Sequence, residues 1–347
     1  MLTNEQKKEL KDALLSSERP IIFFHDDADG VASFLQFYKQ INTGKGIVVK
    51  STPKVDHRFI DTVKNYGPDK IFILDLAILE QDFVDEMSVP IYWLDHHDRA
   101  DIGDNKIKGV KYYNPKQNIE GDNTCIAKLS YDIFGDYLWI AAAGTVGDWQ
   151  LPEDLRKEII EKMPGYLGKD ILRPQDALFK TKVGELSKIF NFVLKGNMKD
   201  VNQAFKILSR INEPEELLHE TSEQGRYLMK RYKKITKEYD SLIKKAESQV
   251  KNDDPLLIFT YEENKTSLSG EISNELLFKY PGKIIIVARH HNGEMKTSFR
   301  GSKNIKGILE KAVEGIEGRV GGHLNACGGL IKDYEWDKFI NNLRALI

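Results

Sequence analysis

The sequence predicts an α/β protein with a parallel sheet near its N-terminus, a helical connector, and a smaller α/β domain at its C-terminus. In the first half, apolar runs alternate with segments long enough for helices, which is typical of a parallel sheet covered on both faces. The central part is rich in charged residues and carries few strand signals, and the C-terminal part returns to strand-like runs. We expect the domain bounds at residues 1–190, 191–252 and 253–347.

The N-terminal sheet is predicted from four runs of β-forming side chains, Ile21–Phe24, Gly46–Lys50, Lys70–Ala77 and Ile91–Leu94. The first helix is expected from Val31 to Tyr38. The run of small residues at Ala141–Gly144 predicts a tightly packed helix that leads into the sequence TVGDWQ.

The connector is predicted to contain one long amphipathic helix. Pro214 and the two acids after it indicate a helix start close to Asn212. Beyond it, apolar residues recur at alternating spacings of four and three, at Leu228, Tyr232, Ile235, Tyr239, Leu242 and Ala246. This stripe fits either a coiled-coil dimer or packing within the chain, and we favour packing within the chain because the stripe is short.

The C-terminal domain is expected to begin after Asp253, Asp254 and Pro255, which break the long helix. The chain then shows a strand, a helix, a hairpin around the type I′ turn signal His291-Asn292-Gly293, and a further helix. These elements are expected at Leu256–Thr260, Glu271–Tyr280, Lys283–His290, Glu294–Phe299 and Ile305–Val313, and the glycine-rich GGHLNACGG completes the domain.

Composition narrows the range of functions. The chain has 51 basic and 53 acidic residues and a net charge of −2, which argues against a protein that coats duplex nucleic acid but permits a small phosphate-binding site. No apolar stretch is long enough to cross a membrane, so we expect no membrane partner. The two cysteines, Cys125 and Cys327, lie outside any CxxC pair, which favours a reducing cytoplasmic location over a disulfide framework or a zinc–thiolate site.

Acidic and histidine side chains follow the predicted strands, where the chain leaves the sheet. Because the carboxyl ends of parallel strands meet at one edge, we expect these side chains to share one crevice. They are His25, Asp27, Asp29, Asp75, Asp95, His96 and His97, joined by Asp148 of TVGD. Carboxylates mixed with imidazoles suit Mn²⁺ or a similar ion, and so many acids need cations to offset their repulsion. Two ions about 3.5–4 Å apart would also activate a water for attack at phosphorus.

Each of these features has an ordinary explanation when it stands alone. A single acidic loop such as HDDADG is most often a solvated turn, and an Asp at a strand end is usually a helix cap. His290 and His291 beside the hairpin turn are expected to be surface residues, and Asp26 a solvated acid. Four such strand or helix ends in one order rarely arise by chance, so the combination predicts a site.

These motifs resemble those of the DHH phosphoesterase family. HDDADG is similar to the first DHH motif, Asp75 to the second, Asp95-His96-His97 to the motif that names the family, and TVGD to the fourth. SFRGS at 298–302 and GGHLNACGG at 321–329 resemble the two signatures of the DHHA1 domain, although Cys327 stands where the family commonly has alanine. The resemblance is to the RecJ-type and nanoRNase-type branch of exonucleases and oligonucleotide phosphodiesterases.

The resemblance implies a role for each site residue. His25 and Asp27 would hold one Mn²⁺ ion, Asp29, His96 and Asp148 the other, and Asp75 would bridge the two, with Mg²⁺ or Co²⁺ as substitutes. His97 would face the substrate and Asp95 would orient a histidine. In the C-terminal domain Arg300 would grip a phosphate bidentately, and Gly321, Gly322 and His323 would add backbone and side-chain donors.

The expected function is a two-metal phosphodiesterase, and the favoured form is an exonuclease that degrades single-stranded DNA or RNA stepwise to 5′-mononucleotides. Two alternatives stay open: a phosphoesterase for dinucleotides, nanoRNA or a 3′-phosphonucleotide, and a nuclease-fold scaffold in a replication or repair complex. A replication or repair protein is also a candidate partner of an active nuclease, with the charged connector as the docking surface.

Overall fold

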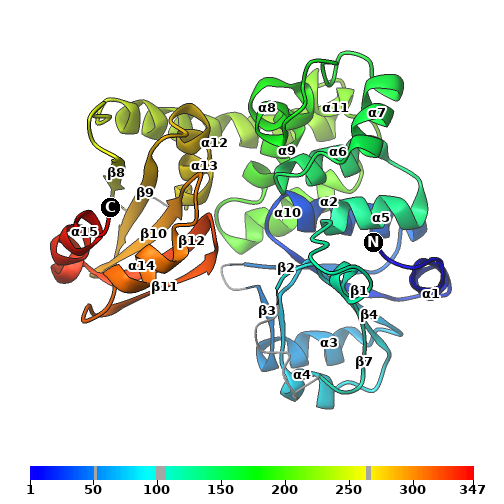
Figure 1. The fold of residues 1–347 in the computed structure, drawn as a ribbon. Helices are drawn as coiled ribbons and strands as arrows, with labels where there is room; N and C mark the ends of the chain where they lie inside the picture. Colours follow the sequence, from blue (N-terminus) through cyan, green and yellow to red (C-terminus); the bar gives the residue numbers. More distant parts are fainter. Residues whose placement is uncertain (51–52, 99–106, 263–266) are drawn as a thin grey trace. The chain divides into compact units, whose positions relative to one another are not determined.

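The computed structural model describes residues 1–50, 53–98, 107–262 and 267–347 (Figure 1). The chain divides into two compact units. Unit 1 comprises Met1–Leu194 and Met198–Tyr232, and unit 2 comprises Lys195–Asn197 and Lys233–Ile347. The division falls within a long helix, α12 (Glu223–Glu247). The predicted three-part division, with a separate connector at 191–252, stays a prediction.

Unit 1 is built on a parallel sheet, and this confirms the predicted fold class. In the described residues the sheet has five strands in the order β2-β1-β4-β6-β7, and every neighbouring pair is parallel. The strands are β1 (Ile21–His25), β2 (Lys45–Val49), β4 (Ile71–Leu74), β6 (Ile91–Leu94) and β7 (Val110–Tyr113). The chain passes from β1 to β2 on one side and returns to β4 on the other, so the strand order reverses between β1 and β4. In open α/β sheets, ligands bind at the carboxyl ends of the strands at such a reversal.

Helices cover both faces of this sheet (Figure 1). One face packs on α3 (Ile60–Tyr66) and α4 (Gln81–Asp85) around a core that includes Phe23, Phe83 and Trp93, each with no exposed surface. On the other face lies α2 (Ala28–Ile41), against which α5 (Ile126–Phe134) and α6 (Leu138–Gly147) pack. Gly144 permits the close packing of α6 on α2, because a Cβ there would lie 2.4 Å from the Cβ of Ala32. The predicted tightly packed helix at Ala141–Gly144 is therefore present.

Three strands of unit 1 were not predicted. The edge strand β7 has the sequence VKYY, which is too polar to stand out as a buried run. The other two, β3 (Lys54–Val55) and β5 (Ile78–Leu79), are two residues long and form a small parallel pair of their own. Short paired segments of this kind carry no periodicity that a sequence can reveal.

The rest of unit 1 is helical. Besides the N-terminal α1 (Asn4–Leu15), three helices after α6 pack against it, a fourth packs on one of these, and the chain also forms two 3₁₀ turns. Their bounds are η1 (His57–Phe59), η2 (Pro115–Gln117), α7 (Glu153–Lys162), α8 (Pro174–Lys180), α9 (Lys182–Val193), α10 (Met198–Leu208) and α11 (Glu215–Leu218). The helix start expected near Pro214 opens only the single turn of α11, and the long helix begins at Glu223.

The apolar stripe predicted on the long helix is buried within the chain. All six of its members are at most 9 % exposed: Leu228, Tyr232, Ile235, Tyr239, Leu242 and Ala246. In unit 1 the ring of Tyr232 lies 5.8 Å from that of Phe192, and in unit 2 the hydroxyl of Tyr239 donates to Glu275. Because the stripe is already covered, packing within the chain is favoured over a coiled-coil dimer.

Unit 2 is a second α/β fold with a mixed sheet. Its strand order is β11-β12-β10-β9-β8, in which β8 and β9 are parallel and the other neighbours antiparallel. α13 packs against β9 and β10, whereas α14 and α15 share a core with Phe299 and Phe339. The elements are β8 (Leu256–Tyr261), α13 (Ser269–Lys279), β9 (Ile284–His291), β10 (Glu294–Arg300), α14 (Lys306–Ala312), β11 (Gly318–His323), β12 (Ala326–Lys332), η3 (Asp333–Glu335) and α15 (Trp336–Ala345).

The turn signal between β9 and β10 is confirmed, because Asn292 and Gly293 have φ values of 50° and 74°, as a type I′ turn requires. The sequence GGHLNACGG, by contrast, forms the β11–β12 hairpin, which was not predicted. In the described residues no helix is long and apolar enough to span a membrane.

Candidate metal centre and phosphate-binding residues

The predicted site residues of unit 1 meet at the carboxyl ends of three adjacent strands. His25 is the last residue of β1, Asp75 follows β4 directly, and Asp95 follows β6. The parallel ladder continues past the strands, because the backbone N–H of Asp75 donates to Leu94 and that of Asp95 to Tyr113. The backbone that carries these side chains is therefore fixed by the sheet.

The first group of side chains is His25, Asp27 and Asp75. The Nδ1 atom of His25 lies 2.8 Å from Oδ2 of Asp27 and 3.6 Å from Oδ2 of Asp75. Asp27 caps α2, since its Oδ1 accepts the backbone N–H of Gly30 at 2.9 Å. A glycine is required at position 30, because a Cβ there would lie 2.4 Å from the carbonyl oxygen of His25. Close approach, and not an unusual turn, is the reason for this glycine.

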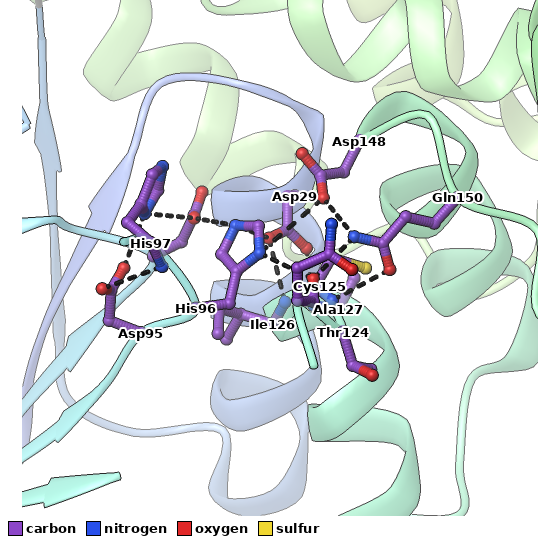
Figure 2. Close-up of polar contacts among 12 residues, drawn as sticks. Asp29, Asp95, His96, His97, Thr124, Cys125, Ile126, Ala127, Asp148 and Gln150 are labelled. Carbon is purple, nitrogen blue, oxygen red and sulfur yellow. Dashed lines mark hydrogen bonds and ion pairs between the residues drawn. The ribbon is translucent and has the colours of Figure 1, made fainter. Parts of the chain in front are cut away.

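The second group is Asp29, His96 and Asp148. Figure 2 shows the His96 ring beside the carboxylates of Asp29 and Asp148. Its Nε2 lies 3.9 Å from Oδ2 of Asp29 and 3.4 Å from Oδ1 of Asp75, and its Nδ1 lies 4.0 Å from Oδ2 of Asp148. Asp75 therefore lies next to both groups, which is the position that a bridging ligand needs.

Asp75 shows two signs of a functional constraint. Its φ of 57° places it in the left-handed region, which non-glycine residues seldom occupy. Its side chain is 2 % exposed, and Oδ2 accepts no hydrogen bond from the residues that the structure describes. A buried carboxylate oxygen without a donor is costly unless a cation completes its surroundings.

The charges in the crevice also favour a cation. Burial and the nearby charges of Asp75 and Asp148 raise the pKa of Asp29 well above its usual range. Burial likewise raises the pKa of Asp148 to about 7, with Asp75 and Asp27 adding to the shift and His96 opposing it. Burial lowers the pKa of His25 and His96, but the carboxylates around each ring outweigh it and raise both values. The donors are oxygens and imidazole nitrogens, so the residues present fit one or two hard divalent ions.

The thiol nearest to this crevice is unsuited to metal binding. Cys125 is fully buried, and burial together with Asp29 and Asp148 raises the pKa of its thiol well above the usual range. A protonated thiol is a poor ligand.

Asp95 and His97 form a hydrogen-bonded pair beside these groups, and His97 also makes a third group of possible metal ligands with Asp75 and His96. Oδ1 of Asp95 lies 2.7 Å from Nδ1 of His97, and its Oδ2 accepts the backbone N–H of the same histidine at 3.1 Å. Asp95 has no exposed surface, and this pairing holds its pKa below the usual range despite burial. With Nδ1 donating to Asp95, a neutral His97 ring carries its lone pair on Nε2.

A further group of candidate ligands, Asp56, His57 and Glu80, was not predicted. Lys54 forms ion pairs with both acids, and Nε of Arg58 lies 2.7 Å from Oδ1 of Asp56. Cations of the protein therefore already compensate these carboxylates, in contrast to those at the strand ends.

In unit 2, Arg300 is held in place by several acceptors. Its Nε donates to Oδ1 of Asn274 at 2.6 Å, and Nη1 donates to the carbonyls of Phe299 and Cys327 at 2.9 and 3.4 Å. Nη2 donates to none of the residues that the structure describes. Burial lowers the pKa of the guanidinium to about 10, so Arg300 remains charged at neutral pH. Nη2 alone can therefore donate to a phosphate without breaking a bond. The predicted bidentate contact would also use Nε or Nη1 and would displace one of the hydrogen bonds given above.

Gly321, Gly322 and His323 end the exposed strand β11. Gly322 has a φ of 138° and a Cβ there would lie 2.6 Å from the carbonyl of Ala326, whereas a Cβ at Gly321 would meet nothing within 4 Å. His323 and Arg300 are both in register with Ala326 on the strand between them. Their side chains therefore leave the same face of the sheet, two strands apart.

Sequence reasoning missed several residues around the crevice. Gln150 donates to Asp148, and Lys116 donates to the carbonyl of His96 at 2.7 Å. Asp26, which was expected to be a solvated acid, has a side chain that is only 21 % exposed and lies 3.7 Å from Nε2 of His25. The contact of Gln150 could have been suspected only from the sequence TVGDWQ, which places its amide two residues after Asp148.

The comparisons with known proteins agree with the predicted resemblance. Residues 253–347 match the family model of the DHHA1 domain. RecJ from Thermus thermophilus in complex with Mn²⁺ superimposes with a TM-score of 0.69 at 16 % identity, over 98 % of this chain and 54 % of that one. An exonuclease RecJ bound to manganese gives a TM-score of 0.62 at 16 % identity, over 98 % and 93 % of the two chains.

A third solved structure, described as the DHH domain of a member of a family of ribosomal proteins, gives a TM-score of 0.66 at 13 % identity over 98 % and 89 % of the chains. No curated protein matched the chain in sequence. At these identities the superpositions establish the fold, and the chain spans about half the length of the Thermus protein.

Proposed function

We propose that this chain, a DHH/DHHA1 protein of RecJ-like fold, is a two-metal phosphodiesterase that degrades single-stranded DNA or RNA from an end to 5′-mononucleotides. The observation that carries the proposal is the place of Asp75, which belongs to one ligand group and lies 3.4 Å from His96 of the other, and whose buried Oδ2 accepts no hydrogen bond from the described residues. His25 and Asp27 would hold one ion, and Asp29, His96 and Asp148 the other. Mn²⁺ is the proposed ion, with Mg²⁺ and Co²⁺ as substitutes.

When bound, the two ions supply an activated water and positive charge for an in-line displacement at phosphorus. The chain's own residues bind and orient the reacting groups. Asp75 fixes the spacing of the two ligand groups, because the sheet and a left-handed backbone hold it in one conformation.

His97 is the proposed proton donor or hydrogen-bond donor to the substrate. Burial lowers its pKa, but the hydrogen bond and charge of Asp95 outweigh this and raise it above the usual value. The ring is therefore protonated at neutral pH more often than a free imidazole, and its Nε2 can donate to a phosphoryl oxygen or to the leaving oxygen.

Arg300 and His323 are proposed to bind a second phosphate or the terminal nucleotide. The guanidinium is held by Asn274 and two carbonyls, so little side-chain entropy is lost when its remaining donors meet a phosphate. Gly322 keeps β11 in a conformation that other residues avoid, and this presents the end of the strand with His323.

A single strand is the proposed substrate because the net charge of −2 supplies no excess of cations for a duplex. If the protein binds one or two phosphates near an end of the strand, it cleaves that strand stepwise from the end. Both cysteines are free and buried, in keeping with the proposed cytoplasmic location. A replication or repair protein remains a proposed partner, with the charged helices of the 191–252 region as its contact.

The test is a gel of end-labelled single-stranded DNA and RNA of two, five and fifteen nucleotides, incubated with Mn²⁺. We expect a ladder and mononucleotides from the fifteen-nucleotide strands, and resistance of a blunt duplex and a circular strand. Asp75→Asn should abolish the ladder, and the control Glu80→Gln should not, because its carboxylate belongs to the group already compensated by Lys54.

Two results would overturn this assignment. A rate that falls steeply with length would make the protein a dinucleotide or nanoRNA phosphoesterase. Absence of any hydrolysis by a chain that binds Mn²⁺ would favour a scaffold role in a larger complex.

A further inference from the structure

Gln150 lies outside both ligand groups, yet it contacts Asp148 of the second group and the backbone beside that group (Figure 2). Its Nε2 donates to Oδ2 of Asp148 at 2.8 Å and to the carbonyl of Asn123 at 2.8 Å. Its Oε1 accepts the backbone N–H of Cys125 at 3.1 Å. One amide therefore uses both of its donor hydrogens and its acceptor to connect a carboxylate with a backbone segment.

The segment that Gln150 holds, residues 123–127, contacts the two other members of the group. The carbonyl of Asn123 also accepts from Nδ1 of His96 at 2.9 Å. Both oxygens of Asp29 accept backbone N–H groups, Oδ2 from Ile126 at 2.9 Å and Oδ1 from Ala127 at 2.6 Å. Gln150 and one stretch of backbone thus make hydrogen bonds to Asp29, His96 and Asp148 together.

These bonds select the atoms that face the crevice. With Nδ1 of His96 donating to Asn123, the neutral ring that binds a metal carries its lone pair on Nε2, which is the atom nearest to Asp75 and Asp29. Oδ2 of Asp148 accepts from Gln150 and lies 4.0 Å from Nδ1 of His96, so the amide orients this carboxylate beside the ring.

The backbone places Gln150 for this role. α6 ends at Gly147, Trp149 takes a left-handed φ of 58°, and the N–H of Gln150 donates to the carbonyl of Thr145 at 3.0 Å. A left-handed tryptophan is uncommon and costs free energy. This backbone conformation brings the Gln150 amide back onto Asp148, two residues away.

We infer that Gln150 is a positioning residue for the second metal ion: it ties Asp148 to the 123–127 segment and so fixes all three ligands of that ion. It touches neither substrate nor metal itself. The inference rests on the proposed two-metal function. It predicts that loss of the amide weakens one ion and spares the ion held by His25 and Asp27.

The test variant is Gln150→Met, which keeps the length of the side chain and removes its hydrogen bonds. Gln81→Met is a matched control, because Gln81 makes the same three kinds of bond elsewhere in unit 1. Its Nε2 donates to Asp85 at 2.7 Å and to the carbonyl of Lys108 at 3.2 Å, and its Oε1 accepts the N–H of Lys108 at 2.9 Å. Mn²⁺ binding to the full chain is measured by titration calorimetry, and paired ions are detected by electron paramagnetic resonance.

We expect the parent and Gln81→Met to bind two ions each. Gln150→Met should bind its first ion as the parent does and its second about 10- to 100-fold more weakly, as is typical when a residue that orients metal ligands is lost. The signal of coupled ions should then need correspondingly more Mn²⁺, and hydrolysis should recover at high Mn²⁺. Parental affinity for both ions, or equal loss of both, would overturn the inference.

A second variant, Gln150→Glu, separates positioning from charge. A carboxylate cannot donate to Asp148 or to Asn123, so the positioning role predicts weaker binding of the second ion. An added negative charge acting alone would tighten it, and that result would overturn the inference. A parent chain that binds no Mn²⁺ would instead overturn the proposed function on which the inference rests.

Discussion

Without metal, the protein should lose stability as the pH rises from about 5 to about 8. The central group is Asp148, whose pKa burial raises to about 7 in the folded chain, against 3.8 for the free side chain. An acid whose pKa is raised in the folded state keeps its proton up to a higher pH in the native state than in the unfolded state. Its contribution is therefore fully present below about pH 4 and is lost as the pH rises through about 7.

The size of this loss follows from the shift. About three pKa units at about 1.36 kcal/mol each give at most about 4 kcal/mol between pH 4 and 7, of which about two thirds falls above pH 5. The Asp148 side chain is 29 % exposed, so water reduces the effect, and we expect about 1–3 kcal/mol. For a domain of this size that is a fall in Tm of roughly 2–10 °C. His25 and His96, whose pKa values are raised, lose stabilisation in the same direction.

The assay is thermal unfolding in a chelator at pH 5, 6, 7 and 8, repeated with Mn²⁺. Mn²⁺ should restore stability most at high pH, because it replaces the protons that the acids would otherwise keep. Asp148→Asn should flatten the slope of the metal-free protein between pH 5 and 7. A metal-free Tm that stays constant or rises over this range would refute the electrostatic account of the crevice.

Three further predictions concern single residues. Asp75→Asn should lower hydrolysis by roughly 1,000-fold or more and reduce Mn²⁺ content. Because asparagine also tolerates the left-handed backbone, an unchanged melting temperature serves as the control for folding. Activity within tenfold of the parent would contradict the role of Asp75 as a shared ligand. His97→Ala should leave the Mn²⁺ content nearly intact while slowing turnover about 100-fold. Asp95→Asn should reproduce part of this loss and lower the pKa seen in the pH–rate profile. Loss of metal from His97→Ala would instead make His97 a ligand. Arg300→Ala should weaken oligonucleotide binding by about 1.5–3 kcal/mol, and His323→Ala should weaken it less. Neither variant should affect metal content or the cleavage of a small artificial phosphodiester. An equal loss of activity on both substrates would contradict a separate phosphate-binding role.

The sequence predicted the parts of the fold that carry strong local signals. The strands at Ile21–Phe24 and Ile91–Leu94 and the Asn292-Gly293 turn were found because buried β-runs and type I′ turns need particular residues. The polar edge strand β7 and the glycine-rich hairpin β11–β12 were missed, because their pairing depends on neighbouring strands and not on their own composition. The terminal helix α15 was also missed, although Phe339 and Leu343 bury one face of it.

In the site, the side chains that follow strands could be placed from the order of the motifs. The contacts that hold them could not, because they join residues far apart in sequence through the backbone. Asp29 accepts N–H groups almost a hundred positions later in the chain, at Ile126 and Ala127. Gln150 likewise acts on carbonyl and N–H groups of the 123–127 segment, which has no motif of its own. The bonds that already occupy Arg300 also depend on strand register and were not foreseen.

The most direct test of the two-ion centre is an anomalous-scattering map of the protein crystallised with Mn²⁺. The account predicts two peaks about 3.5–4 Å apart at the carboxyl ends of β1, β4 and β6, with Asp75 between them. A single peak there, no peak at all, or manganese at Asp56, His57 and Glu80 instead would contradict it.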